Sequence, residues 1–142
     1  MKGSKDILSS ILKTTQMGQI GIRSILRCPL RAALRTELNT QLQEYNAIEQ
    51  EAHGIARTKG WTLEELNPAI KGMTNLMTGT RLSFGNVDSK AAQMMIQGNT
   101  RGIIKGYKNL NQYPSSDERI TVLAQKLIDF EEVNNRQLQG FL

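Results

Sequence analysis

The sequence predicts an all-α protein, a four-helix bundle made of two helical hairpins in one domain spanning residues 1–142. Apolar residues recur at alternating intervals of three and four in four long stretches, which is the period of an amphipathic helix. Short breaks containing glycine, proline or capping residues separate these stretches. The chain has only three prolines, one tryptophan, three tyrosines and three phenylalanines, and β-branched alternation is scarce. A β-sandwich or barrel is therefore not expected.

The first predicted hairpin contains helices over about 5–26 and 30–59. Ser4 is the expected cap of the first helix, and Asp6 lies in its first turn. Pro29 suits the start of the second helix, and Gly60 suits its end. The residues expected to face the core are Ile11, Thr15, Gly18, Ile22 and Ile25 on the first helix, and Leu34, Leu38, Gln41, Tyr45, Ile48, Ala52 and Ile55 on the second.

A long crossover over 60–87 is expected to carry a short helix of its own over about 68–81. Thr62 and Glu65 form a capping-box pattern before it, and Met73 and Met77 would face inward. A crossover of this length lets the helices on either side of it run parallel.

The second predicted hairpin contains helices over about 88–111 and 116–140. Asp88 or Ser89 is the expected cap of the first of these helices, and Ser115 begins a capping box for the second. The predicted core positions are Ala92, Ile96, Asn99, Ile103, Gly106 and Leu110, then Ile120, Leu123, Leu127, Phe130, Asn134, Gln137 and Phe141. A shift of 85 residues places Tyr45 on Phe130 and Leu38 on Leu123, which suggests that the two hairpins are related.

Two hairpins joined by one long crossover resemble the ferritin-like superfamily. Residues 5–70 resemble, more narrowly, the ferritin-like spore-coat proteins of Firmicutes. The matching segments are Asp6-Ile7-Leu8, Leu12-Lys13-x-Thr15, Pro29-Leu30-Arg31 and Lys59-Gly60-Trp61. This resemblance implies a ferritin-like bundle in a bacterial protein, with the spore coat as one setting for a structural role.

A ferritin-type di-iron centre is not expected in this chain. Such a centre takes one Glu from each of two helices and a Glu-x-x-His pair from each of the other two. The first helix has no carboxylate after Asp6, Gln50 stands three residues before His53, and the last helix has no histidine. No cofactor is therefore expected.

A smaller metal site is the alternative. Glu49 and His53 lie one helical turn apart, and Glu131 or Glu132 could face them across the bundle, where a single transition-metal ion would find oxygen and nitrogen ligands. The simpler interpretation, which we favour, is a Glu–His pair that bridges helix faces.

The net charge of +5 is concentrated near the N-terminus, where residues 1–36 hold seven basic residues and one acidic residue. Arg23, Arg27, Arg31 and Arg35 recur every fourth residue. One interpretation is an anion-binding strip for phosphate, nucleic acid or an acidic partner. The other, which we favour, is a solvated corner whose arginines pair with carboxylates. No aromatic residue interleaves the arginines, so nucleic acid is not an expected partner.

Glycines and amides interrupt the apolar stripes. Gly98, Gly102 and Gly106 predict a close packing interface with the first helix, the crossover helix or a second subunit. Met94 and Met95 are expected to fill the core. The amides at core positions, Gln41, Asn99, Asn134 and Gln137, predict a polar layer that fixes helix register, with a repurposed cavity as the alternative.

The composition limits the functional classes. One cysteine, Cys28, excludes an intrachain disulfide and a cysteine-based zinc site. No apolar run approaches the length of a membrane span, so a soluble, cytoplasmic protein without a membrane partner is expected. No nucleophile–base pair is identifiable, and the interpretation leans away from an enzyme. We therefore expect a non-enzymatic, metal-free bundle that acts by assembly, as a homo-oligomer such as a dimer, or by binding a protein partner.

Overall fold

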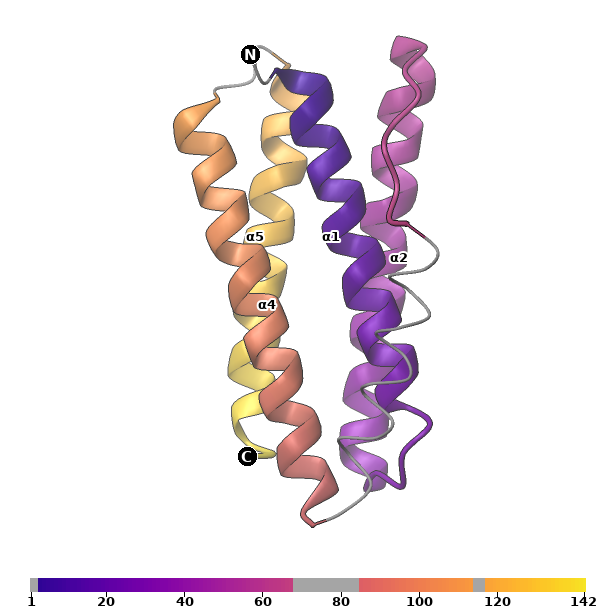
Figure 1. The fold of residues 1–142 in the computed structure, drawn as a ribbon, viewed down its shortest axis with the longest axis vertical. Helices are drawn as coiled ribbons and strands as arrows, with labels where there is room; N and C mark the ends of the chain where they lie inside the picture. The colour runs from indigo at the N-terminus through magenta and orange to yellow at the C-terminus, as the bar shows by residue number, and fades with distance from the viewer. Residues whose placement is uncertain (1–2, 68–84, 114–116) are drawn as a thin grey trace.

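The computed structural model describes residues 3–67, 85–113 and 117–142, and in these ranges it contains four α-helices and no strand. The helices are α1 (Ser4–Ile25), α2 (Ala32–Lys59), α4 (Val87–Gln112) and α5 (Glu118–Gln139) (Figure 1). The all-α, four-helix prediction is confirmed, and each helix begins and ends within two residues of its predicted bounds. The predicted helix over 68–81, with Met73 and Met77, lies outside the described residues.

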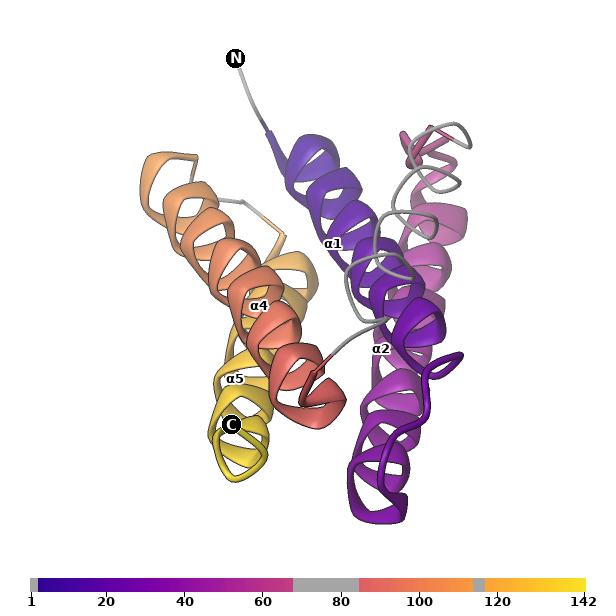
Figure 2. The ribbon, with the colours of Figure 1, turned by 60° about the horizontal axis from the view of Figure 1, so that its bottom comes forward.

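The helices form two antiparallel hairpins, α1–α2 and α4–α5, that lie side by side (Figures 1 and 2). Helices α2 and α4 run in the same direction. After α2 the chain turns back along α1, where the Glu64 N–H donates to Ser9 Oγ at 3.3 Å and the Leu66 N–H donates to Gln16 Oε1 at 3.2 Å. Residues 61–67 contain neither a helix nor a turn, so the capping-box pattern of Thr62 and Glu65 begins no such element in this stretch.

The core follows most of the predicted stripes. All the predicted α2 positions are buried except Ile55, which is half-buried and whose place is taken by Ala56. On α4 the buried face is rotated, because Ala91 and Met95 are buried while Ile103 is only half-buried. Apolar spacing locates a helix face only to about one residue, and packing against the neighbouring helix selects the final orientation.

The two aromatic positions that the shift of 85 residues equates are in contact with each other. Tyr45 and Phe130, which the shift of 85 residues equates, meet across the bundle with ring centroids 4.8 Å apart and ring planes at 84°. Edge-to-face packing of this kind is favourable for aromatic pairs. It fixes α2 against α5 at mid-height.

Helix ends differ from the sequence prediction in detail. Gly3 rather than Ser4 precedes α1, and Asp6 Oδ2 accepts from the Gly3 N–H at 2.9 Å. Asn86 rather than Asp88 or Ser89 caps α4, since its side chain accepts from the Ser89 N–H. These corrections shift each start by one or two residues and leave the helices unchanged.

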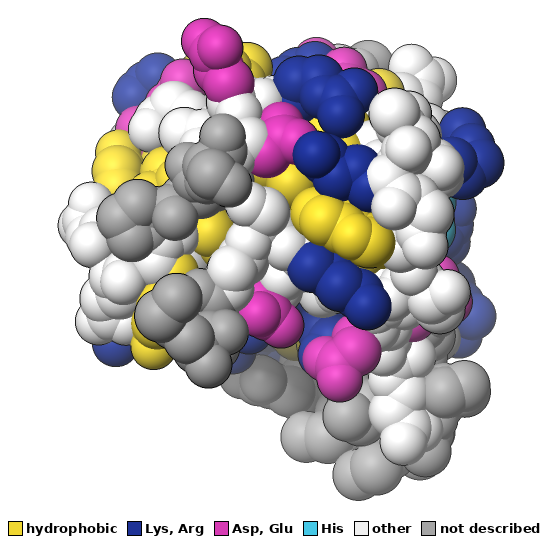
Figure 3. Space-filling model, turned by 90° about the horizontal axis from the view of Figure 1, so that it is seen from above, with side chains coloured by type: hydrophobic (Ala, Val, Ile, Leu, Met, Phe, Trp, Pro, Cys, Tyr) yellow, Lys and Arg dark blue, Asp and Glu magenta, His cyan; other side chains and the backbone are white. Residues whose placement is uncertain are grey.

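The upper end of the bundle is held by charged and aromatic contacts. Gly60 ends α2 with φ of 69°, a left-handed conformation that glycine adopts without strain. Lys59 Nζ lies 5.4 Å from the centre of the Trp61 ring and 2.5 Å from Asp117 Oδ2, which joins the end of α2 to the start of α5. Viewed from above, lysine and arginine side chains lie beside hydrophobic ones at this end (Figure 3). Among the described residues, no helix is both long and apolar enough to cross a bilayer.

Candidate functional site

A hydrogen-bonded group of three polar side chains lies at the centre of the bundle. Tyr45 comes from α2, Asn99 from α4 and Glu131 from α5, and their exposed fractions are 0%, 1% and 2%. The Tyr45 hydroxyl lies 2.8 Å from Asn99 Oδ1 and 2.7 Å from Glu131 Oε2. Each residue stands on the buried face of its helix, so the bundle itself brings them together.

Two glycines make room for this group. A Cβ at Gly18 on α1 would lie 2.5 Å from Cζ of Tyr45, closer than a real Cβ approaches a neighbour. A Cβ at Gly102 on α4 would collide with Glu131 Oε1. Glycine is therefore required on both helices for the side chains of Tyr45 and Glu131 to reach the centre.

Burial decides the protonation of the group. It raises the pKa of Glu131 to about 8, and the hydrogen bond with Tyr45 opposes this shift only in part. Burial also raises the pKa of Tyr45 well above its usual value, with the charge of Glu131 adding to the effect. At neutral pH the carboxyl is therefore mostly protonated, and the Tyr45 hydroxyl has one proton to give. With one proton on each hydroxyl, the Glu131 carboxyl donates a hydrogen bond to the Tyr45 oxygen, and the Tyr45 hydroxyl donates to Asn99 Oδ1.

Some buried polar atoms in this region have no hydrogen-bond partner among the described residues. They include Asn99 Nδ2 and Glu131 Oε1, and also both side-chain polar atoms of Gln41 and Nδ2 of Asn134. Gln41 lies one turn before Tyr45, and Asn134 lies three residues after Glu131 on a helix of opposite direction. The two amides therefore belong to the next layer of the core. Gln137, the fourth amide predicted for the core, is exposed, so that prediction was wrong.

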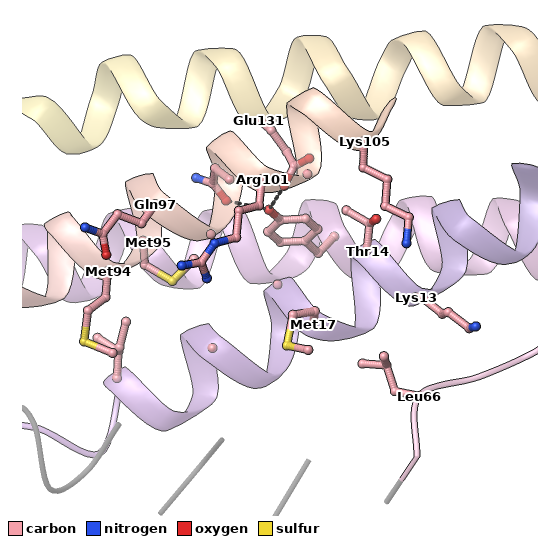
Figure 4. Close-up of a pocket in the computed structure, with 17 residues that line it drawn as sticks. Lys13, Thr14, Met17, Leu66, Met94, Met95, Gln97, Arg101, Lys105 and Glu131 are labelled. Atoms are coloured by element: carbon pink, nitrogen blue, oxygen red, sulfur yellow. Dashed lines mark hydrogen bonds between the residues drawn. The ribbon is translucent and has the colours of Figure 1, made fainter. Parts of the chain in front are cut away.

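A cavity of about 500 Å³ opens onto this group (Figure 4). Tyr45, Asn99 and Glu131 lie along its inner side, together with the bare backbone of Gly18 and Gly102. Its other walls come mainly from α1 and α4. These lining residues are Lys13, Thr14, Met17, Gly21, Ile25, Leu66, Met94, Met95, Gln97, Gly98, Arg101 and Lys105.

The ends of the cavity differ in character. Lys13, Lys105 and Leu66 lie toward one end, and Met94 and Met95 lie toward the other (Figure 4). The methionines predicted as core filler thus line a cavity, although Met95 itself is buried.

A second carboxylate cluster lies between α1 and α2. Glu49 accepts from Gln19 Nε2 at 3.0 Å and from Gln16 Nε2 at 3.1 Å, and His53 Nε2 lies 3.9 Å from it. Gln16 Nε2 also donates to Glu65 Oε1 at 3.0 Å, which ties the segment after α2 to α1. This cluster joins structural elements and opens onto no described cavity.

The predicted metal candidates do not meet. Glu49 bonds to α1 and has His53 beside it, Glu131 bonds to Tyr45, and Glu132 accepts from the exposed Tyr107 hydroxyl at 3.1 Å. Within residues 3–67, 85–113 and 117–142, no three His, Cys, Asp or Glu side chains lie close enough to hold a metal ion. The expectation that Glu131 or Glu132 faces the Glu49–His53 pair was therefore wrong.

The predicted arginine strip is divided. Arg35 Nη1 and Nη2 each donate at 2.8 Å to the carbonyls of Leu26 and Cys28, so Arg35 closes the loop after α1. Arg31 is 90% exposed and lies 4.0 Å from Asp88 Oδ2, whereas Arg23 and Arg27 are exposed. Arg35 is therefore engaged within the loop, and the other three arginines lie on the surface.

The glycine stripe on α4 packs against α5, an element that the sequence prediction did not name. Cβ atoms at Gly102 and Gly106 would collide with Glu131 and with Ile128, both on α5. Gly98 has no neighbour within 4 Å of a Cβ position and lines the cavity instead. Close approach of two helices explains the first two glycines, and open space explains the third.

The sequence held a signal for the central group that was not used. Leu127, Glu131 and Asn134 are spaced by four and three, and they continue the three-and-four spacing of Ile120, Leu123 and Leu127, which places Glu131 on the buried stripe of α5. The α5 prediction used Phe130 instead.

Comparisons of this chain with protein-family models, with characterised proteins and with solved structures found no match.

Proposed function

We propose that this protein is a non-enzymatic, ferritin-like helical bundle that works by binding a small, largely apolar molecule in its central cavity. The observation that carries the proposal is the cavity of about 500 Å³, whose walls are largely apolar and whose inner side is formed by Tyr45, Asn99 and Glu131. Small-molecule sites in proteins are of this size and combine apolar walls with a few placed polar groups.

The central group costs more stability than a fully paired polar layer would. A buried polar atom without a partner costs about 1–3 kcal/mol. Asn99 Nδ2 and Glu131 Oε1 both carry that cost on the inner side of the cavity. A layer that only fixed helix register would pair its amides with one another, which Asn99 does not do.

The wider assignment rests on the sequence resemblance and on topology. Two hairpins with parallel α2 and α4 agree with a ferritin-like bundle. A cytoplasmic or spore-coat setting and a homodimer are part of this proposal. Neither a metal site nor an arginine strip gains support as a second function.

The test compares two glycine variants with the wild type. Gly98→Leu adds a side chain to the cavity wall at a position where a Cβ meets no atom within 4 Å, while Gly54→Leu, on α2 outside the cavity, is the matched control. Fluorescence titration with anilinonaphthalene sulfonate follows binding, and circular dichroism checks the fold. We expect at least tenfold weaker binding for the Gly98 variant alone. Equal binding by all three folded proteins would overturn the proposal.

A further inference from the structure

We propose that the cavity binds a single-chain amphiphile with an anionic headgroup, lying lengthwise between α1 and α4. This inference rests on the proposed function and names the class of ligand for the same cavity. The anionic group would lie near Arg101 and Lys105, and the hydrocarbon chain would extend toward Met94 and Ile25. The shape of the cavity, the placement of charge along it and the lack of acidic partners for two cations lead to this assignment.

The cavity is elongated along the helix axes. Its lining on α1 extends from Lys13 to Ile25, and its lining on α4 extends from Met94 to Lys105. At 1.5 Å per residue these segments are about 16–18 Å long. Helices α1 and α4 run in opposite directions, so Lys13 and Lys105 share one end, and Ile25 and Met94 share the other (Figures 1 and 4). A long, narrow molecule fits this space better than a compact one.

The part of the cavity toward Met94 carries no charge. No lining residue is charged from Met94 to Gly98 on α4, or from Thr14 to Ile25 on α1. Met94, Met95 and Ile25 provide apolar walls there. Methionine side chains are unbranched and flexible, so they adapt to a hydrocarbon chain.

The middle of the cavity accepts a chain without polar contacts. The unpaired atoms Asn99 Nδ2 and Glu131 Oε1 have almost no accessible surface, so a molecule in the cavity does not bond to them. Much of the lining here is the bare helix of Gly18, Gly98 and Gly102. Backbone groups within a helix are already bonded to one another. A methylene chain passing this point therefore displaces no hydrogen bond of the protein.

Two cations at the cavity have no acidic partner. All 13 acidic residues of the chain lie in the described ranges, and none of them lies within 4.0 Å of the charged nitrogens of Arg101 or Lys105. Lys13, by contrast, pairs with Glu64 at 2.8 Å. The one acidic lining residue, Glu131, is mostly neutral at pH 7. Unpaired cations beside apolar walls favour an anionic group on the ligand.

Arg101 and Lys105 lie one helical turn apart on α4, and both are exposed. In Figure 4 the Arg101 side chain extends over the middle of the cavity, and Lys105 lies nearer the end with Lys13. Both side chains are long and accessible, so an anionic group that lies between them can be reached by both. Its chain would then occupy the uncharged part of the cavity.

Competition with bound anilinonaphthalene sulfonate tests the headgroup, with each competitor below its micelle concentration. Dodecanoate, dodecanol and dodecyltrimethylammonium share one alkyl chain and differ in charge. We expect dodecanoate to bind about tenfold more tightly than dodecanol, because two exposed ion pairs each add a few-fold to affinity. The cationic amphiphile should bind more weakly than dodecanol. Equal affinity for dodecanoate and dodecanol would overturn the inference.

A second series tests the chain. Each buried methylene group contributes about fourfold to affinity, so octanoate should bind at least tenfold more weakly than dodecanoate. Acetate, which has the headgroup without a long chain, should not displace the probe. Displacement by acetate at the concentrations that suffice for dodecanoate would show a simple anion site and would also overturn the inference.

Charge variants locate the headgroup. Arg101→Gln combined with Lys105→Gln should weaken dodecanoate binding about tenfold and leave dodecanol unchanged. Lys108→Gln combined with Arg136→Gln is the matched control, because it removes the same charge from exposed positions outside the cavity. The affinity of each variant for the probe is measured first, and circular dichroism checks its fold. Equal weakening by both double variants would show an effect of net charge and would contradict the assignment.

The two proposals fail separately. The dependence of probe binding on Gly98 is measured without any competitor, so a missing preference for anionic amphiphiles leaves the proposed function intact. Probe binding that does not depend on Gly98 would remove both proposals.

Discussion

Glu131 and Glu49 are two carboxylates on inner faces of the bundle with opposite surroundings. Both oxygens of Glu49 accept hydrogen bonds, from Gln16 and Gln19, and its side chain keeps 16% of its exposure. Glu131 is 2% exposed, bonds only to Tyr45 and leaves one oxygen unpaired. The comparison shows that amide donors and some solvent make a carboxylate a structural link. Burial without enough donors instead produces a neutral acid with spare hydrogen-bonding capacity.

The largest expected effect is a pH dependence of stability that comes from Glu131. Its pKa is about 8 in the folded protein and 4.5 ordinarily, so between these values the folded state holds a proton that the unfolded chain has lost. The contribution of Glu131 to the free energy of unfolding should therefore be greatest below about pH 4.5, fall as pH rises and level off above about pH 8. The total change is up to about 5 kcal/mol.

Chemical denaturation of Glu131→Gln across this range isolates the effect. The difference in stability between variant and wild type should move in favour of the variant as pH rises. The groups that face Glu131 are Tyr45 on α2, whose pKa is raised by burial, and, across the cavity, Lys13, Arg101 and Lys105. Glu44→Gln, on the exposed face of α2, is the control. A difference for Glu131→Gln that stays constant from pH 4.5 to 8 would contradict the assignment.

The next largest effect on stability compares Gly18, which is packed against the Tyr45 ring, with Gly98, which borders open space. Gly18→Ala should destabilise the protein by about 1–2 kcal/mol, because overlap with the Tyr45 ring outweighs the better helix propensity of alanine. Thermal or urea denaturation measures this change in the free energy of unfolding. A stabilised Gly18→Ala protein would show that Tyr45 does not lie against α1 as described.

Gly98→Ala should have the opposite sign. Its Cβ meets nothing within 4 Å, so only helix propensity changes, and we expect stabilisation by about 1 kcal/mol. The same denaturation experiment compares it directly with Gly18→Ala. Destabilisation by Gly98→Ala would mean that this part of the cavity wall is packed.

The smallest expected effect belongs to the Glu49 cluster. Glu49→Gln keeps an acceptor for Gln16 or Gln19 and loses only a partly exposed charge, so unfolding should change by less than about 1 kcal/mol. Measured beside Glu131→Gln at pH 8, it should show the smaller change of the two. A larger change at Glu49 would reverse the contrast drawn between the two carboxylates.

Much of the fold could be predicted from the sequence, because helix period and helix-ending residues are local properties. The stripe on α2 and the end of that helix at Gly60 are examples. The incorrect predictions concern which side of a helix faces the core and which neighbouring helix it contacts. The α4 stripe is rotated, Gln137 is exposed, and the glycines contact α5 rather than the predicted partners.

The candidate site could be predicted only in fragments. Asn99 and Gln41 were recognised as amides in the core, and Glu131 was considered only as a metal ligand. Their juxtaposition with Tyr45 joins residues 45, 99 and 131, and no local spacing relates positions so far apart.

The order of residues by itself determined four amphipathic helices, their ends and the lack of a histidine–carboxylate set for two iron ions. Those properties depend on local hydrogen bonding, side-chain periodicity and residue identity. Only the packing of α1, α2, α4 and α5 decided that Glu131 loses its solvent, keeps a proton and borders a cavity. Desolvation and empty volume depend on what every neighbouring helix contributes at one point in space.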